Sequence, residues 1–103
     1  MKKPFIHHVF FWMEHPEWSE DKTQLIEALK ELASVKSISA HYIGVPAATD
    51  REVIDRSWDV SWCLFFNSKE DQDSYQEDPE HKAFVAKCAH LWKKVVVYDA
   101  ESV

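Results

Sequence analysis

The sequence lacks the features that would place it on nucleic acid or inside a membrane. Its 12 Lys and Arg are outnumbered by 18 Asp and Glu, which gives a net charge of −6. The basic residues form no stripe beyond the short pairs Lys2-Lys3 and Lys93-Lys94, so we expect no nucleic-acid partner. No apolar run reaches the length of a membrane span, and we expect no membrane partner either.

Cysteine is scarce, with two residues in the chain. Cys63 lies in an apolar, strand-like run and Cys88 in a helix-like run, so both are expected to be small core residues rather than a disulfide framework. The start, residues 1–6, is similar to a signal peptide, but His7 and His8 interrupt it and no small-residue cleavage site follows. We therefore expect a cytoplasmic protein.

Metal-ligand patterns are also missing, although the chain has six histidines. None of them falls in a two-histidine helical spacing, and there is no Cys-x-x-Cys pattern. The adjacent His7 and His8 point to opposite faces of a strand. We expect neither a metal nor a cofactor.

Apolar residues, in contrast, are abundant for a short chain. Hydrophobic residues make up 46% of the 103 residues, and Phe, Trp and Tyr make up 14%. A chain of this length suits one domain, 1–103, whose own core is modest. The excess of apolar surface indicates an oligomer interface or a lined pocket.

Periodicity and cap signals divide the chain into strands and helices. Alternation or β-branched runs predict strands at residues 5–13, 38–45, 57–67 and 95–98. A helix capped by Ser19 carries one apolar stripe, and a second helical region begins after the cap residue Ser68. A long polar connection, 46–56, separates the second and third strands.

This order of elements predicts an α+β protein with the ferredoxin-like βαββαβ plan and a four-stranded antiparallel sheet. The helices of this fold cover one face of the sheet and leave the other bare. On the bare face we expect Val9, Phe11, Phe65, Val96 and Tyr98, which are too apolar to remain in water. A homodimer that pairs two sheets face to face, a dimeric α/β barrel, would cover them.

The second helical region contains a predicted break between Tyr75 and His81. Asp78 is a good N-cap and Pro79 suits the first position of a new helix. In an unbroken helix, six residues would place Tyr75 and His81 on faces about 120° apart. With the break, the phenol and the imidazole can converge.

At this point the chain resembles the stress-responsive A/B barrel family, also called the dimeric A/B barrel or Dabb family. The resemblance covers nearly all residues from Ile6 to Asp99. It depends on four segments in order: His8-Val9-Phe10-Phe11, Trp58-Asp59-Val60 leading to Phe66-Asn67-Ser68, Tyr75-x-x-x-Pro79-x-His81-x-x-Phe84, and Val95-Val96-Val97-Tyr98-Asp99. The family implies a homodimer whose two sheets form a barrel with the helices outside.

Some members of this family are cofactor-free polyketide cyclases, and their catalytic residues match Tyr75 and His81. The likeness further implies a pocket between sheet and helices that binds a small hydrophobic or keto compound. Its lining would be His8, Phe10, Trp12, Val60, Trp62, Leu64, Phe84, Val95 and Val97. The chain departs from the cyclases because Trp12 and Trp62 are bulky enough to fill that space, and because the 46–56 connection has no match.

If the two groups converge, Tyr75 and His81 have the chemistry of an acid/base pair. His81 falls near the third position of its helix, where the positive end of the helix dipole favours a neutral imidazole. It could remove a proton flanked by two carbonyls, while Tyr75 donates a hydrogen bond to the oxygen on which charge develops. No metal is required for this reaction.

Structural roles compete with these catalytic ones. His81 could be a half-exposed residue that balances Glu77 or Glu80, and Tyr75 could be seated between helix and sheet. His8 is typical of a core histidine, and His7 is expected at the interface. Three functions follow: a small-molecule binder with cyclase-like acid/base chemistry, a non-catalytic dimeric stress-response module with a filled pocket, and a monooxygenase-like dimeric barrel, which the tryptophans suggest.

Overall fold

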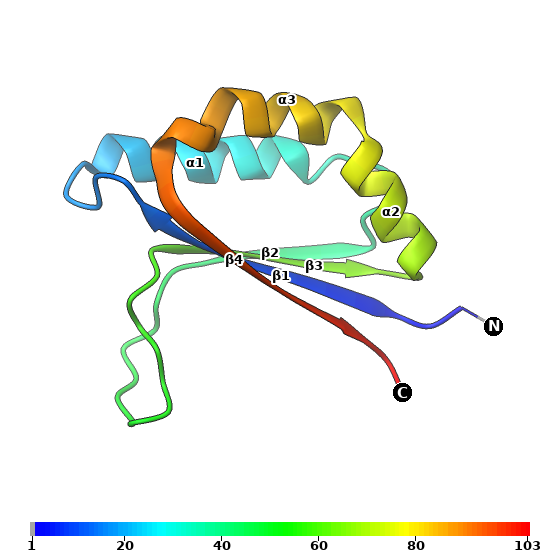
Figure 1. Ribbon diagram of the computed structural model, residues 1–103, viewed down its shortest axis with the longest axis horizontal. Helices are drawn as coiled ribbons and strands as arrows, with labels where there is room; N and C mark the ends of the chain where they lie inside the picture. The colour runs from blue at the N-terminus through cyan, green and yellow to red at the C-terminus, as the bar shows by residue number, and fades with distance from the viewer. Residues whose placement is uncertain (1) are drawn as a thin grey trace.

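The structure is a computed structural model that describes residues 2–103, and Met1, where the signal-like start begins, lies outside them. The elements run in the order β1 (Phe5–Met13), α1 (Ser19–Leu32), β2 (Ala40–Gly44), β3 (Val60–Phe66), α2 (Lys69–Glu77), α3 (Pro79–Cys88), a 3-10 turn η1 (Ala89–Leu91) and β4 (Trp92–Glu101). This is the predicted βαββαβ order, with the second helix in two pieces (Figure 1).

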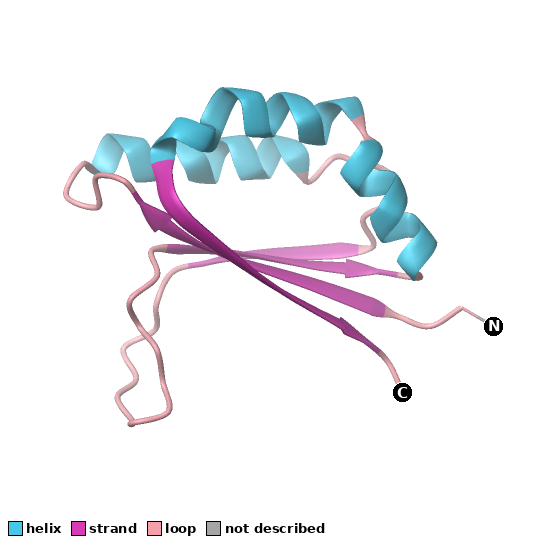
Figure 2. Ribbon diagram, viewed as in Figure 1, coloured by secondary structure: helices cyan, strands magenta, loops and turns pink. Residues whose placement is uncertain are grey.

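The four strands form one antiparallel sheet in the order β2-β3-β1-β4, so β2 and β4 are its edges. The helices of residues 2–103 all lie on one side of this sheet, and this part of the chain places none on the other side (Figure 2). The ferredoxin-like fold and the one-sided cover of the sheet are therefore confirmed.

Local cap chemistry explains where two of the helices begin. Ser68 Oγ accepts a hydrogen bond from Asp71 N at 3.2 Å and starts α2, as predicted. Asp78 Oδ1 accepts from Glu80 N at 2.8 Å and starts α3 at Pro79, also as predicted. The cap predicted for α1 is wrong: Ser19 lies inside the helix, and the N-cap position belongs to Trp18, whose side chain makes no capping bond.

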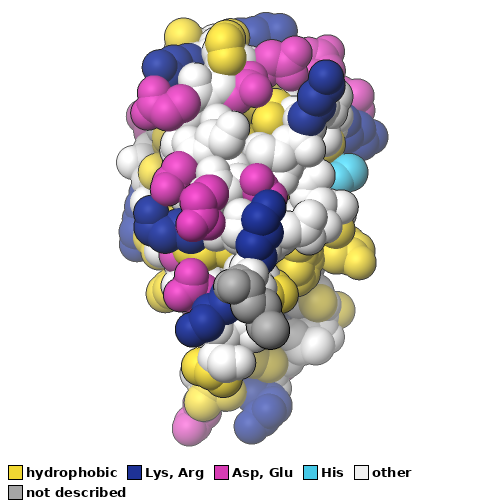
Figure 3. Space-filling model, turned by 90° about the vertical axis from the view of Figure 1, so that its right-hand side faces the viewer, with side chains coloured by type: hydrophobic (Ala, Val, Ile, Leu, Met, Phe, Trp, Pro, Cys, Tyr) yellow, Lys and Arg dark blue, Asp and Glu magenta, His cyan; other side chains and the backbone are white. Residues whose placement is uncertain are grey.

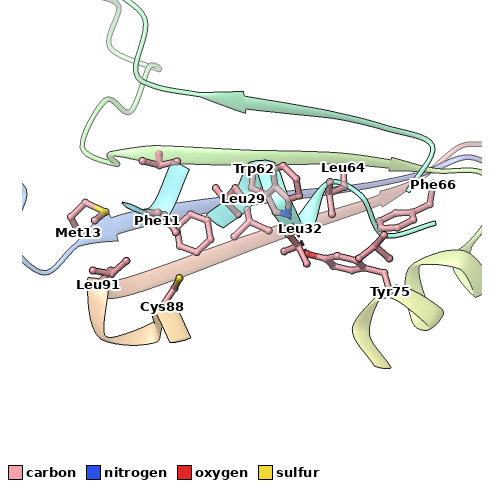
Figure 4. Close-up of a cluster of buried hydrophobic side chains, with 14 of the residues drawn as sticks. Phe11, Met13, Leu29, Leu32, Trp62, Leu64, Phe66, Tyr75, Cys88 and Leu91 are labelled. Carbon is pink, nitrogen blue, oxygen red and sulfur yellow. Dashed lines mark hydrogen bonds between the residues drawn. The ribbon is translucent and has the colours of Figure 1, made fainter. Parts of the chain in front are cut away.

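The core lies between the sheet and the helices (Figure 4). From β1 it takes alternate residues, of which Val9 is 6% exposed and Phe11 3% exposed. The prediction that Val9 and Phe11 lie on the bare face is therefore wrong. Both sets of alternate positions in β1 are apolar, so the pattern shows that the strand alternates without showing which set meets the helices.

The third strand begins later than predicted, at Val60. Alternation along the predicted strand, 57–67, would place Trp58 on the face of Val60 and Trp62. Its ring instead packs edge-on to Phe10, with the ring centroids 5.2 Å apart, on the uncovered side of the sheet. The second strand is shorter than predicted, Ala40–Gly44.

Both cysteines are free: Cys88 is buried in the core as expected, whereas Cys63 is only partly buried, opposite His8.

The surface at the end that carries α2 and both termini shows Lys and Arg interspersed with Asp and Glu (Figure 3). This mixture is typical of a solvated surface rather than of a polyanion-binding stripe. Within residues 2–103, no helix is both long enough and apolar enough to cross a membrane.

Candidate functional site

The break between α2 and α3 brings Tyr75 and His81 together. Tyr75 lies near the end of α2 and His81 in the first turn of α3, with Asp78 between the helices. Their ring centroids are 4.6 Å apart and the rings meet edge to face at 60°. The predicted convergence of the phenol and the imidazole is confirmed by this geometry.

The hydroxyl of Tyr75 is held inside the protein by Trp62. Tyr75 is 2% exposed and Trp62 1% exposed, and Trp62 Nε1 donates to Tyr75 Oη at 3.2 Å (Figure 4). Burial raises the pKa of Tyr75 to about 12, although the hydrogen bond from Trp62 acts in the opposite direction. Tyr75 is therefore a neutral phenol at pH 7, with its own O–H free to donate to a third group.

His81 is half-buried, and its pKa is lowered. Burial is the largest cause and the charge of His7 the next, while the backbone of Gln76 and the carboxylate of Asp78 act in the opposite direction. A lowered pKa keeps the imidazole neutral at pH 7. Sequence analysis anticipated a neutral His81 but attributed it to the helix dipole, whereas the structure adds burial and a second histidine.

That second histidine, His7, is a site residue that sequence analysis missed. It is buried on the face of β1 that meets the helices, and its ring centroid lies 6.1 Å from that of Tyr75. Its Nδ1 and Asp99 Oδ1 are 2.6 Å apart, across the register that pairs β1 with β4. The expectation that His7 serves the interface is wrong.

The pairing with Asp99 connects His7 of β1 to the edge strand β4. A carboxylate oxygen accepts hydrogen bonds, so in this contact His7 Nδ1–H donates to Asp99 Oδ1. The two residues are 92 positions apart, and only the β1–β4 register unites them. The available sequence signal was that Asp99 follows Val95 and Val97 at alternate positions, the set that continues one strand face.

Three predicted pocket residues lie on the wrong side of the sheet. His8, Phe10 and Trp12 alternate with the buried residues of β1 and therefore point away from the helices. The His8 ring contacts that of Phe10 at a tilt, with the ring centroids 4.2 Å apart, and Trp12 Nε1 donates to Ser57 Oγ at 3.0 Å. The prediction that they line the space between sheet and helices is wrong for the same reason as the placement of Val9 and Phe11, a choice between two apolar sets.

The other predicted lining residues lie on the helix side of the sheet or on α3. Val60, Trp62 and Leu64 are almost fully buried there. Val95 and Val97 pair with Phe11 and Val9 on the same side, but each remains 44% exposed because β4 is an edge strand. Phe84 stacks on Trp92 with the ring centroids 5.9 Å apart.

A groove of about 590 Å³ lies between α1 and α3. Its lining includes Leu32, Glu80 and Phe84 but neither Tyr75 nor His81. The groove is therefore separate from the Tyr75 site. Within residues 2–103 no three His, Cys, Asp or Glu side chains are grouped so as to hold a metal ion.

The uncovered side of the sheet, here called the open face, is mostly aromatic and aliphatic. Tyr42 and Tyr98 are each 66% exposed, and Ile6 is 37% exposed. The rings contact one another, Phe10 with Tyr98 at 6.0 Å and Tyr42 with Phe65 at 5.8 Å. The open face is defined by Ile6, His8, Phe10, Trp12, Tyr42, Trp58, Cys63, Phe65, Val96 and Tyr98.

Solved structures similar to this one share its fold along nearly the whole chain. A Dabb family protein with a ferredoxin-like fold from Mesorhizobium loti has a TM-score of 0.81 at 18% identity, covering 99% of each chain. A dimeric ferredoxin-like protein of unknown function from Thermobifida fusca has a TM-score of 0.79 at 18% identity, covering 99% of this chain and 93% of the other. The hydroxynitrile lyase of Passiflora edulis has a TM-score of 0.80 at 17% identity, covering 100% and 96%.

At these identities the neighbours show the fold and not the activity. A search of curated proteins finds no significant match. The model of the stress responsive A/B barrel domain family, in contrast, matches residues 5–102, which include the whole span of the sequence resemblance, Ile6 to Asp99. The chain therefore belongs to the stress-responsive A/B barrel (Dabb) family.

Proposed function

We propose that this protein is a homodimer, joined through the open face, in which each protomer binds a small carbonyl compound beside Tyr75 and His81 and performs acid/base chemistry on it. The contact between the two rings at 4.6 Å carries the proposal. A neutral base and a neutral donor held side by side are what proton abstraction next to a carbonyl needs.

The dimer is supported by the exposed side chains of the open face. Large aromatic residues such as Tyr42 and Tyr98 form one surface with Phe10 and Phe65. A connected apolar surface of this kind is typical of an interface rather than of a monomer in water. The similar Thermobifida fusca protein is described as dimeric, which agrees with this proposal.

In the proposed reaction, His81 accepts a proton from the carbon next to the carbonyl. The C–H electron pair moves toward the carbonyl oxygen, where the O–H of Tyr75 stabilises the developing charge. The charge of His7, whose Nδ1 lies 2.6 Å from Asp99 Oδ1, lowers the pKa of His81 and so helps to keep its imidazole an unprotonated base. Returning the proton from His81 to a different atom of the compound completes an isomerisation.

Trp62 limits the size of the compound. Its indole is buried and bonded to Tyr75 Oη, so it occupies space that a long polyketide chain would need. We therefore propose a compact substrate of a few carbons rather than an extended one. The fold tolerates small-molecule chemistry, since the similar Passiflora edulis protein is a hydroxynitrile lyase.

The test is hydrogen exchange on a β-keto ester. We would follow loss of the C2 proton of ethyl 2-methylacetoacetate in D₂O by NMR, with the protein and with the variants His81→Gln and Tyr75→Phe. General base catalysis is worth about 10²- to 10⁴-fold, so the His81 variant should lose most of the enhancement. The matched control is His90→Gln, an exposed histidine in η1.

A second candidate is a non-catalytic dimeric stress-response module. The observation that favours it is the Trp62–Tyr75 hydrogen bond inside the core, which two fully buried side chains also form for stability alone. Under this alternative the native protein exchanges the keto-ester proton no faster than the same concentration of free imidazole. The variants His81→Gln, Tyr75→Phe and His90→Gln then exchange it at the same rate as the native protein.

A further inference from the structure

The connection between β2 and β3, residues 45–59, is an arm that leaves the body of the molecule. It extends on the side of the sheet opposite the helices, beside the open face (Figure 1). The radius of gyration is 14.2 Å, whereas a compact chain of this length has about 13 Å. An arm of this shape, on that side, reaches into the space where a molecule bound to the open face would sit.

The base of the arm is held firmly against the open face. Trp12 Nε1 donates to Ser57 Oγ at 3.0 Å, and Asp55 Oδ1 accepts from Ser57 N at 2.8 Å and from Ser57 Oγ at 2.6 Å. Trp58 Nε1 donates to the Asp55 carbonyl at 2.9 Å while its ring packs on Phe10. These bonds orient the arm before any partner arrives.

The arm is mostly polar, but it carries two exposed valines. Residues 47–53 are all exposed, and Val53 is 79% exposed. Val45, where the arm leaves β2, is 52% exposed. The hydrogen bond from Ile54 N to Arg51 O, 2.9 Å, closes a turn within the tip itself. A held base with exposed valines is suited to contact another surface with little ordering cost.

We infer that the arm clasps a second copy of this chain seated on the open face, with Val53 as a contact. The inference rests on the proposed dimer and adds a second, separate contact region to it. The open face and the arm are continuous through Trp12 and Trp58, so a copy bound to one lies against the other. Two-fold symmetry then gives two arms, each holding the opposite protomer.

The first experiment compares dimer dissociation constants by sedimentation equilibrium. Val53→Asp should weaken the dimer at least tenfold, because it places a charge in a contact that buries an apolar side chain. Val103→Asp is the matched control, since it is the same substitution at a fully exposed valine at the end of the chain. Circular dichroism should show both variants folded, because both sites are exposed.

The second experiment uses endoproteinase Arg-C, which cuts preferentially after arginine. Arg51 and Arg56 lie on the arm and are exposed in a single protomer. Cleavage at these sites should be at least tenfold slower in the dimer than after dilution below its dissociation constant. The Tyr98→Asp variant, altered on the open face and not on the arm, should be cut as fast as the diluted protein.

These experiments separate failure of the arm from failure of the dimer. If native protein is monomeric, or if Tyr98→Asp leaves the dimer intact, the open-face dimer is refuted and the arm inference with it. If Tyr98→Asp gives monomers while Val53→Asp associates as tightly as native protein and Arg51 is cut equally fast in dimer and monomer, the dimer stands and the arm inference is overturned.

Discussion

The two faces of the sheet carry similar side chains and are covered very differently. On the helix side, Phe11 is 3% exposed and Trp62 1% exposed. On the open face, Tyr42 and Tyr98 are each 66% exposed although they are also aromatic. Residue type therefore does not separate the core from the open face in this protein. The helices make the difference, because they cover one face of the sheet and not the other. We therefore expect the same kind of side chain to support folding on the helix side and association on the open face.

The largest expected effect is on the covered face. Replacing Trp62 by Ala should cost about 3 to 5 kcal/mol of folding free energy, because it removes a buried ring and leaves a cavity. Urea unfolding measures the loss. Trp58→Ala, on the open face, is the comparison and should cost clearly less. A small loss for Trp62 would instead mean that the indole borders space already empty, which favours a ligand site.

The next largest expected effect is on stability at alkaline pH, and it comes from Tyr75, which is buried on the helix side. Burial raises the pKa of Tyr75 from 10 to about 12 in the folded protein. A raised pKa favours the protonated form, so this stabilisation is present below pH 10 and is lost as pH rises from 10 to 12. At about 1.4 kcal/mol per unit, the total is about 3 kcal/mol.

Spectrophotometric titration at alkaline pH checks this shift. One phenol should ionise near pH 12 in native protein, and the step should be absent from Tyr75→Phe. A Tyr75→Phe protein that still shows the late step would assign it to another tyrosine. The same variant leaves Trp62 Nε1 without its acceptor, so we also expect it to lose about 1 to 3 kcal/mol of stability.

A smaller effect belongs to the open face. Tyr98→Ala should leave the unfolding of each protomer nearly unchanged but weaken the dimer by about 2 kcal/mol, or about 30-fold in dissociation constant. The control is Trp18→Ala, an aromatic residue that is 52% exposed but lies beside α1, away from the open face. Equal effects of the two substitutions would remove the open face as the interface.

The smallest effect concerns one histidine from each face. Burial lowers the pKa of His81 on the helix side and of His8 on the open face. Folding then favours the neutral imidazole, so stability is complete above pH 6.5 and declines as pH falls through 6.5 toward the lower folded pKa values. Thermal unfolding between pH 7.5 and 5 should show this decline.

The variants His81→Gln and His8→Gln assign the decline to the two faces. Each should flatten the pH profile, and His8→Gln should also make dimer dissociation less sensitive to acid, because its ring lies in the proposed interface. His90→Gln is the control and should leave the native profile in place. A profile that no single variant flattens would place the titrating groups elsewhere.

Within the candidate site, sequence analysis located the pair that local chemistry defines. Asp78 and Pro79 end one helix and start another by capping and by the geometry of proline, so the meeting of Tyr75 and His81 followed from adjacent residues. His7 and Asp99 did not follow, because no local signal joins residues 92 positions apart. His8 was chosen in place of His7, an error of one residue that reverses the strand face.

The sequence by itself determined the order of strands and helices, the cap at Ser68, the break at Asp78 and the alternation of β1. These features depend on hydrogen bonds and dihedral preferences within a few residues. Only the tertiary structure decided which side of β1 meets the helices, that Trp62 bonds to Tyr75, and that the arm extends beside the open face. When both sides of a strand are apolar, burial alone cannot distinguish them, and packing against the helices makes the choice.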